Sequence, residues 1–169
     1  MFIPVFGSCP THLNERQDKI RRLLLGELGR VGLQWQSLGR TDYPHEFPLR
    51  EVLTLAKHCA GGLILGFSQF ATDQGMWKKG TPYAKAQRGL VSFPTAWNQL
   101  EAGILFSLDA PLLVFREKSI LGGIFDNGVT DLYVQDMPAP NPSKKERVRL
   151  GEVFRKWSAK VHDRYYGHT

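Results

Sequence analysis

The chain has few cysteines and no long hydrophobic run, and each shortage excludes a class of protein. Its 169 residues include only Cys9 and Cys59, which are too few for a disulfide framework. The CxxC motif that is typical of metal sites is absent. No apolar stretch reaches the roughly 20 residues that a membrane-spanning helix needs. The first ten residues, MFIPVFGSCP, lack the basic flank of a signal peptide. We therefore expect a reduced, cytoplasmic protein without membrane partners, with residues 1–169 forming one domain.

Other signatures are missing as well. The sequence contains no Walker loop and no GxGxxG, which argues against standard NTP hydrolysis and Rossmann dehydrogenase chemistry. The five histidines are dispersed without metal-ligand spacing, so we expect no metal site. Acidic residues are in deficit, 16 against 22 Lys and Arg. The cations are scattered along the chain, and the densest cluster, residues 144–156, fits the polar side of an amphipathic helix. A nucleic-acid partner is therefore not expected.

Short apolar segments alternate with amphipathic ones along the chain. The apolar segments predict strands at residues 2–6, 33–39, 61–67, 111–117 and 131–137. Helical periodicity lies between them and again after the PAPNPS segment. The repeated strand-helix order predicts an α/β, three-layer, flavodoxin-like sandwich with about five parallel strands flanked by helices. Residues 68–93 are predicted to form a long irregular loop, and a shorter helix or turn is expected at residues 119–128.

The segment FPTAWNQLEAGILFSL, residues 93–108, predicts an amphipathic helix with an acid on its apolar stripe. Glu101 lies one turn after Trp97 and one turn before Leu105. A buried carboxylate without partners is costly, and burial raises its pKa while a helix N-terminus lowers it. Such a group suits acid–base work or contact with sugar hydroxyls. Alternatively, Glu101 pairs with a Lys or Arg, or lies at the edge of the stripe.

Ligands of open parallel sheets bind beyond the carboxyl ends of the strands, near the switch in strand order. That rule selects the ends of the first, second and third predicted strands, the second at residues 39–43, and the start of the helix that carries Glu101. The residues that we expect to bind substrate there are Phe6, Gly7, Ser8, Phe67, Trp97 and Asn98. Each has a structural alternative. Gly7 and Ser8 fit an ordinary turn, Trp97 fits core packing, and Asn98 fits helix capping.

The stretch TAWNQLEAGILFSLDAPLLVF resembles the catalytic helix and following strand of two related groups of proteins. In TIR domains that cleave NAD, this helix carries a small residue, then a Trp, and then a Glu four residues after the Trp. Thr95, Trp97 and Glu101 match that order and spacing. In nucleoside 2-deoxyribosyltransferase-like proteins, the Glu is followed by a small residue, a Gly and a Pro-led strand. Glu101-Ala102-Gly103 and DAPLLVF match that pattern.

Both groups break an N-glycosidic bond at a ribose-type sugar. The resemblance implies that Glu101 is catalytic, acting as a nucleophile or by stabilising oxocarbenium character, with Asp73 as a candidate second carboxylate. It implies NAD or a related nucleotide as substrate, with no cofactor, and assembly into a homo-oligomer, with antiphage defence or nucleotide signalling as the setting. The alternatives are a 2-deoxyribosyltransferase or nucleotide hydrolase, a non-catalytic nucleotide sensor, and a TIR-type interaction module.

Overall fold

A five-stranded parallel sheet forms the centre of the computed structural model, which describes residues 2–38, 48–129 and 134–167. Every neighbouring pair in this sheet is parallel. Its strands, in spatial order, are β2 (Leu33–Gln36), β1 (Ile3–Ser8), β3 (Gly62–Gly66), β8 (Leu112–Arg116) and β9 (Val134–Asp136). In the order of the five strands along the chain this is 2-1-3-4-5, the flavodoxin-like arrangement. The predicted fold class is therefore confirmed.

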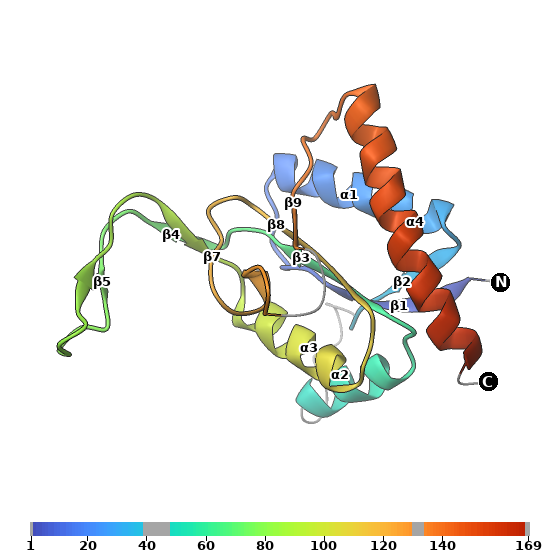
Figure 1. Ribbon diagram of the computed structural model, residues 1–169, viewed down its shortest axis with the longest axis horizontal. Helices are drawn as coiled ribbons and strands as arrows, with labels where there is room; N and C mark the ends of the chain where they lie inside the picture. The colour runs from blue at the N-terminus through green and yellow to red at the C-terminus, as the bar shows by residue number, and fades with distance from the viewer. Residues whose placement is uncertain (1, 39–47, 130–133, 168–169) are drawn as a thin grey trace.

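Two layers of helices cover the sheet (Figure 1). Helices α1 (Glu15–Arg30) and α4 (Lys144–Gly167) lie on one face, and their apolar side chains share a core with the sheet. Helices α2 (Pro48–Lys57) and α3 (Ala96–Ser107) lie on the other face over a second core. All five residues of β3 are buried, as expected for a central strand that is covered on both sides.

Local signals in the sequence set where α1 and α3 begin. Asn14 caps α1 by accepting a hydrogen bond from the backbone N–H of Gln17, whose side chain accepts one from the backbone N–H of Asn14. Thr95 caps α3, and its hydroxyl accepts from the backbone N–H of Asn98 at 3.3 Å. The α3 cap places the first two turns of this helix at the carboxyl ends of β1 and β3.

Residues 68–93 are not an irregular loop, so that prediction is wrong. They form an arm that projects away from the sheet (Figure 1). At its base β4 (Phe70–Thr72) pairs antiparallel with β7 (Val91–Phe93), and farther out β5 (Met76–Trp77) pairs antiparallel with β6 (Lys85–Ala86). Strands of two or three residues are too short to give a visible alternation of polar and apolar residues, so the sequence pattern did not reveal them.

Several predicted elements are shorter in the structure than in the sequence pattern. Strand β2 ends at Gln36 and β9 begins at Val134, while residues 39 and 131–133 of the predicted strands lie outside the described residues. The predicted helix or turn at residues 119–128 contains a short 3-10 helix, η1 (Gly123–Phe125). No helix in the described parts of the chain has the length and apolarity to cross a membrane. Cys9 and Cys59 form no disulfide bond within the described residues.

Candidate active site

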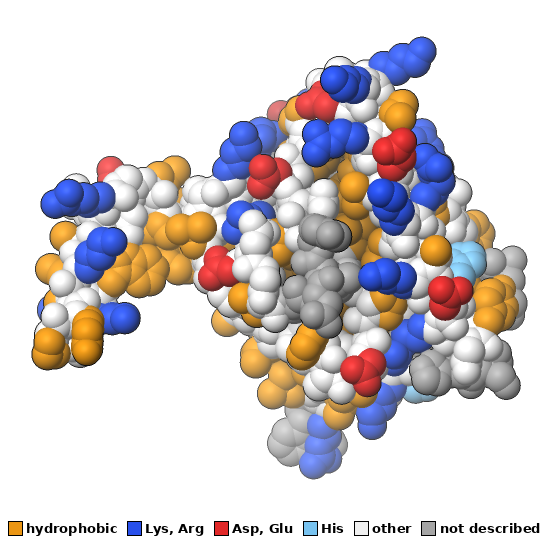
Figure 2. All heavy atoms as spheres, in the orientation of Figure 1, with side chains coloured by type: hydrophobic (Ala, Val, Ile, Leu, Met, Phe, Trp, Pro, Cys, Tyr) orange, Lys and Arg blue, Asp and Glu red, His pale blue; other side chains and the backbone are white. Residues whose placement is uncertain are grey.

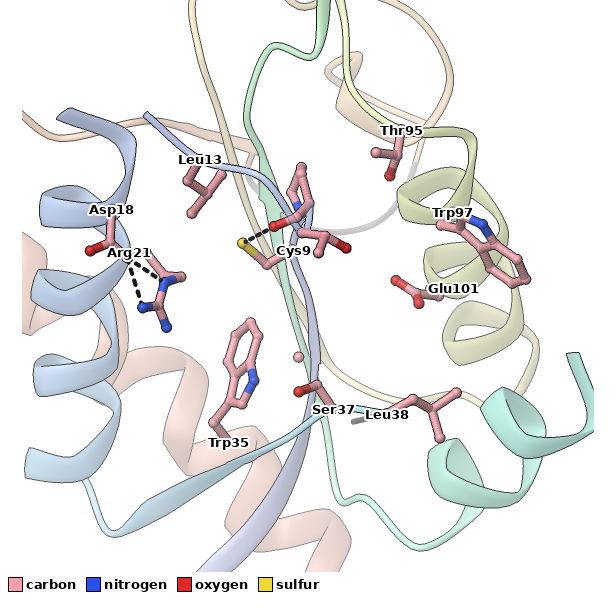
Figure 3. A pocket seen from close by; sticks show the side chains of 13 residues that line it. Cys9, Leu13, Asp18, Arg21, Trp35, Ser37, Leu38, Thr95, Trp97 and Glu101 are labelled. Carbon is pink, nitrogen blue, oxygen red and sulfur yellow. Dashed lines mark hydrogen bonds and ion pairs between the residues drawn. The ribbon is translucent and has the colours of Figure 1, made fainter. Parts of the chain in front are cut away.

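A pocket of about 540 Å³ opens at the carboxyl end of β1. Gly7 of β1 and Trp35 of β2 line it. Arg21 lines it from α1, and Thr95 and Glu101 line it from the cap and the second turn of α3 (Figure 3). Strand β1 lies between β2 and β3 in the sheet, so the strand order switches direction here. Open parallel sheets bind their ligands at this position. A cavity therefore lies where the sequence predicts the site.

The carboxylate of Glu101 points into this pocket from the second turn of α3 (Figure 3). Burial raises its pKa above the usual 4.5, and a hydrogen bond with the Ser8 side chain opposes that rise. Among the described residues, no Lys or Arg forms an ion pair with Glu101. The alternative in which a cation seals this carboxylate therefore finds no support in the described chain.

A directed chain of hydrogen bonds holds Ser8 against Glu101. The Thr95 hydroxyl donates to Asn98 Oδ1 at 3.0 Å, and Asn98 Nδ2 donates to Ser8 Oγ at 2.8 Å. Because Ser8 Oγ accepts from the amide, its single proton is left to donate to the Glu101 carboxylate. Ser8 and Asn98 are both fully buried, so their geometry is fixed by packing. Asn98 therefore both lies in the capped first turn of α3 and positions Ser8.

The apolar stripe predicted for α3 is confirmed at Leu105 and wrong at Trp97 and Leu100. Trp97 is 43% exposed at the pocket rim, and Leu100 is also exposed, whereas Asn98, Ala102 and Leu105 form the buried face. Reading the stripe from the large apolar residues assumed that all of them face the core. In fact Trp97 and Glu101 share the edge that borders the pocket. Of the two roles considered for Trp97, substrate contact and core packing, its exposure argues against core packing.

Five predicted site residues do not line the pocket. Ser8 and Asn98 are buried and act on Glu101 through hydrogen bonds, so their predicted substrate contacts are corrected to a positioning role.

The other three predicted site residues lie away from the pocket, and their predicted roles are corrected as well. Phe6 and Phe67 are 1% and 0% exposed and belong to the two apolar cores. Phe6 lies two residues before the end of β1 and Phe67 directly follows β3, and both side chains pack into the helical layers. Asp73 lies in the projecting arm next to β4 and is exposed. It does not line the pocket, so it is not a second carboxylate beside Glu101.

The prediction missed Trp35, Arg21 and Asp18. The indole of Trp35 lies against Gly7, where a Cβ atom would be only 2.1 Å from Trp35 Cε2. Arg21 donates from Nε and from NH2 to Asp18 Oδ1 at 3.0 and 2.7 Å, and this contact, with the charges of Arg21 and Arg22, lowers the pKa of Asp18. The end selected for the second strand, residues 39–43, lies outside the described residues, and the rule of strand carboxyl ends was not applied to the first turns of the first helix, which supply Asp18 and Arg21.

Comparisons with known proteins leave the family open. No model of a known protein family matches the chain, and no curated protein matches its sequence. Among solved structures, the chain is similar to a diflavin flavoprotein A3 from Nostoc sp., with 13% identity over 99% of this chain and 97% of that chain, and a TM-score of 0.46. The fold assignment rests on the strand order itself. No group of three or more His, Cys, Asp and Glu side chains suited to a metal ion occurs among the described residues.

Proposed function

We propose that the protein is an N-glycosidase that cleaves the base–ribose bond of NAD or a related nucleotide, with Glu101 acting at the ribose. The observation that carries this proposal is a half-buried carboxylate without a cationic partner among the described residues, aimed into a pocket and positioned by Ser8. As the base leaves with the electron pair of the broken bond, an ionised carboxylate there either attacks the anomeric carbon or stabilises the positive charge on the sugar, and water then forms the new bond to that carbon.

The opposite side of the pocket suits the phosphate end of a nucleotide. Arg21 faces Glu101 across the cavity (Figure 3), and Asp18 holds its guanidinium in place through two of the five N–H donors that such a group carries. The remaining donors are suited to phosphate oxygens. The Trp35 indole lies in the same cavity (Figure 3), which supports stacking of a base or nicotinamide ring.

The acids of the pocket favour NAD over a neutral nucleoside. Among its described lining residues, the only carboxylates are Glu101 and Asp18, and the lowered pKa of Asp18 makes it a poor proton donor. Neutral bases usually need a proton on the departing nitrogen, which requires a general acid. The nicotinamide of NAD is a cation when bound to ribose and leaves as a neutral molecule, so no acid is needed.

The test is release of free nicotinamide from NAD by the purified protein. The assay uses a high protein concentration, because the TIR resemblance implies activity on assembly. NAD, nicotinamide mononucleotide, purine nucleosides and deoxynucleosides are compared, each with and without a free acceptor base. Base release from the nicotinamide substrates supports the proposal. Base exchange on a deoxynucleoside would instead support a deoxyribosyltransferase. Thermal stabilisation by a nucleotide without turnover would support a nucleotide sensor. A setting in antiphage defence stays a proposal from the family resemblance.

We expect Ser8→Ala to move the acidic limb of the pH–rate profile to higher pH. The Ser8 hydrogen bond lowers the pKa of Glu101, so losing it raises that pKa further, and a higher pH is then needed to ionise the carboxylate. The profile of kcat/KM against pH reports this ionisation in the free enzyme. Ser92→Ala is a matched control, because Ser92 is equally buried and its hydroxyl accepts from Ser119 away from the pocket. An unmoved or downward-shifted limb would contradict this role.

A further inference from the structure

The projecting arm is too small to bury its own large apolar side chains, and most of them are exposed. Its two strand pairs comprise three and two residue pairs, and an isolated two-stranded hairpin has no core of its own. Phe70 is 62% exposed and Tyr83 is 76% exposed, and Met76, Trp77 and Leu90 are exposed as well. None of these side chains lines the pocket that contains Glu101, and none takes part in the proposed reaction. Their exposure therefore calls for a separate explanation.

The arm is also cationic. Residues 68–93 contain four cations, Lys78, Lys79, Lys85 and Arg88, and one acid, Asp73. None of the ion pairs within the described residues involves these four cations. Cationic and hydrophobic side chains lie beside one another along the arm (Figure 2). A surface of this composition is complementary to a polyanion that also offers flat apolar faces.

One side of the arm is hollowed, and the hollow combines a ring with two cations. It measures about 500 Å³ and is lined by Trp77, Lys85, Ala86, Gln87 and Arg88. The indole Nε1 of Trp77 donates to Gln87 Oε1, and Gln87 Nε2 donates to the carbonyl of Gly89 at 2.7 Å. These bonds fix the orientation of the indole. Its ring centroid lies 6.0 Å from that of Phe93, so aromatic surface continues toward the base of the arm.

We propose that this arm binds single-stranded nucleic acid, with bases stacking on Trp77 and phosphates contacting Lys85 and Arg88. Base–aromatic stacking beside a positively charged groove is the usual physics of sequence-tolerant single-strand binding. The sequence argued against a nucleic-acid partner because its cations are scattered, but the arm gathers four of them around exposed rings. A role in nucleic-acid binding is independent of the reaction proposed for the Glu101 pocket.

Two other occupants fit the arm less well. A second copy of this chain carries the same net charge of +6, so no overall charge complementarity favours it. An anionic membrane would receive the tip of the arm, but the tip carries Lys78, Lys79 and Thr81, and the Thr81 hydroxyl donates to the carbonyl of Lys78. The tip also carries Tyr83, but one exposed ring beside two lysines is far smaller than the apolar face with which an interfacial helix enters lipid.

The test is fluorescence anisotropy of a labelled oligo(dT) of about 16 nucleotides titrated with the full chain at several salt concentrations. We expect Trp77→Ala to weaken binding about tenfold and Trp77→Phe to weaken it less, because a ring remains for stacking. The Lys85→Glu, Arg88→Glu double variant should weaken binding further. It should also lower the slope of log K against log salt by about 1.4, since each phosphate contact contributes about 0.7.

A matched control separates the arm from general charge. Lys144→Glu with Lys145→Glu makes the same change of charge at the exposed start of α4, and binding should change less than about threefold. Equal losses in the control and the arm variant would overturn the proposal, as would no binding by the wild type at low salt. Arm variants that still bind oligo(dT) but dissociate an oligomer of the wild type would overturn the proposal in favour of a second copy of the chain. Arm variants that still bind oligo(dT) but no longer bind vesicles of anionic phospholipid would overturn it in favour of a membrane.

Discussion

Glu101→Gln is expected to abolish release of nicotinamide from NAD while leaving the fold intact. The amide keeps the shape of the carboxylate and still accepts the Ser8 hydrogen bond, but it carries no charge to attack the sugar or to stabilise its cation. Removing one preorganised electrostatic contact from a transition state costs about 10²–10³-fold in kcat, and loss of a full charge should cost at least that. Steady-state nicotinamide release by both proteins measures the effect.

The stability of this variant supplies its own control. Burial raises the pKa of Glu101 above 4.5, so the native state holds the proton more tightly than the unfolded state does. The contribution of Glu101 to the free energy of unfolding is therefore full at low pH and is lost as the pH rises through the raised pKa. A neutral Gln escapes this loss. At pH 7 the melting temperature of Glu101→Gln should equal or exceed that of the wild type, and the difference should shrink below pH 4.5.

Two results would contradict the assignment of Glu101. Turnover within tenfold of the wild type would show that another group carries the reaction. A loss of activity together with a clearly lower melting temperature at pH 7 would point to a structural role instead. Gly103→Ala is the control on the same helix, because an added Cβ there has no atom within 4 Å. Alanine in place of glycine in α3 should stabilise the protein by up to about 1 kcal/mol and leave turnover unchanged.

The layers of the fold were predictable because their signals are local and repeated. GLILG in β3 and LLVF in β8 are uninterrupted apolar runs, which is what a strand buried on both faces requires. Glu101 was identifiable because a carboxylate among apolar helical positions is conspicuous, and the resemblance around it reinforced the choice. The arm was not predictable, since its strands are short and its exposed rings, Trp77 and Tyr83, look like core residues in a linear pattern.

The rest of the site depends on how distant segments meet. Trp35 and Arg21 reach the pocket from β2 and α1, and only the strand order brings them opposite α3. Asn98 is similar. Its burial against Ser8 joins residues 90 positions apart, and the sequence showed only that it shares a helix face with Glu101. Phe6 and Phe67 failed as predictions because a residue at the end of a strand can point either to the crevice or to a helical layer, and the pattern does not choose between them.

The contact between Gly7 and Trp35 is where fold and pocket depend on one another most closely. Gly7 lies in β1 with the Trp35 indole over it, and an added Cβ would meet Trp35 Cε2 at 2.1 Å and Cδ2 at 2.2 Å. Ordinary contacts begin near 3.4 Å, so the ring must move by more than an ångström. We therefore expect Gly7→Ala to push the indole out of its position in the pocket.

This displacement should have two measurable effects. Overpacking of this kind costs about 1–3 kcal/mol, so the urea midpoint of unfolding should fall. The KM for NAD should rise or turnover should be lost, because Trp35 lines the same cavity as Glu101. Gly26→Ala is the matched control in α1, where an added Cβ meets nothing within 4 Å, and it should be neutral or stabilising.

A double variant shows whether the steric clash is the cause. If Gly7→Ala acts through the indole, then Trp35→Ala in the same background should cost less stability than Trp35→Ala alone, because the added methyl group occupies space that the ring has left. Additive losses would mean that Gly7 acts through the backbone of β1 instead. The coupling energy between these two positions therefore tests whether one glycine preserves both the β1–β2 packing and the pocket that Glu101 lines.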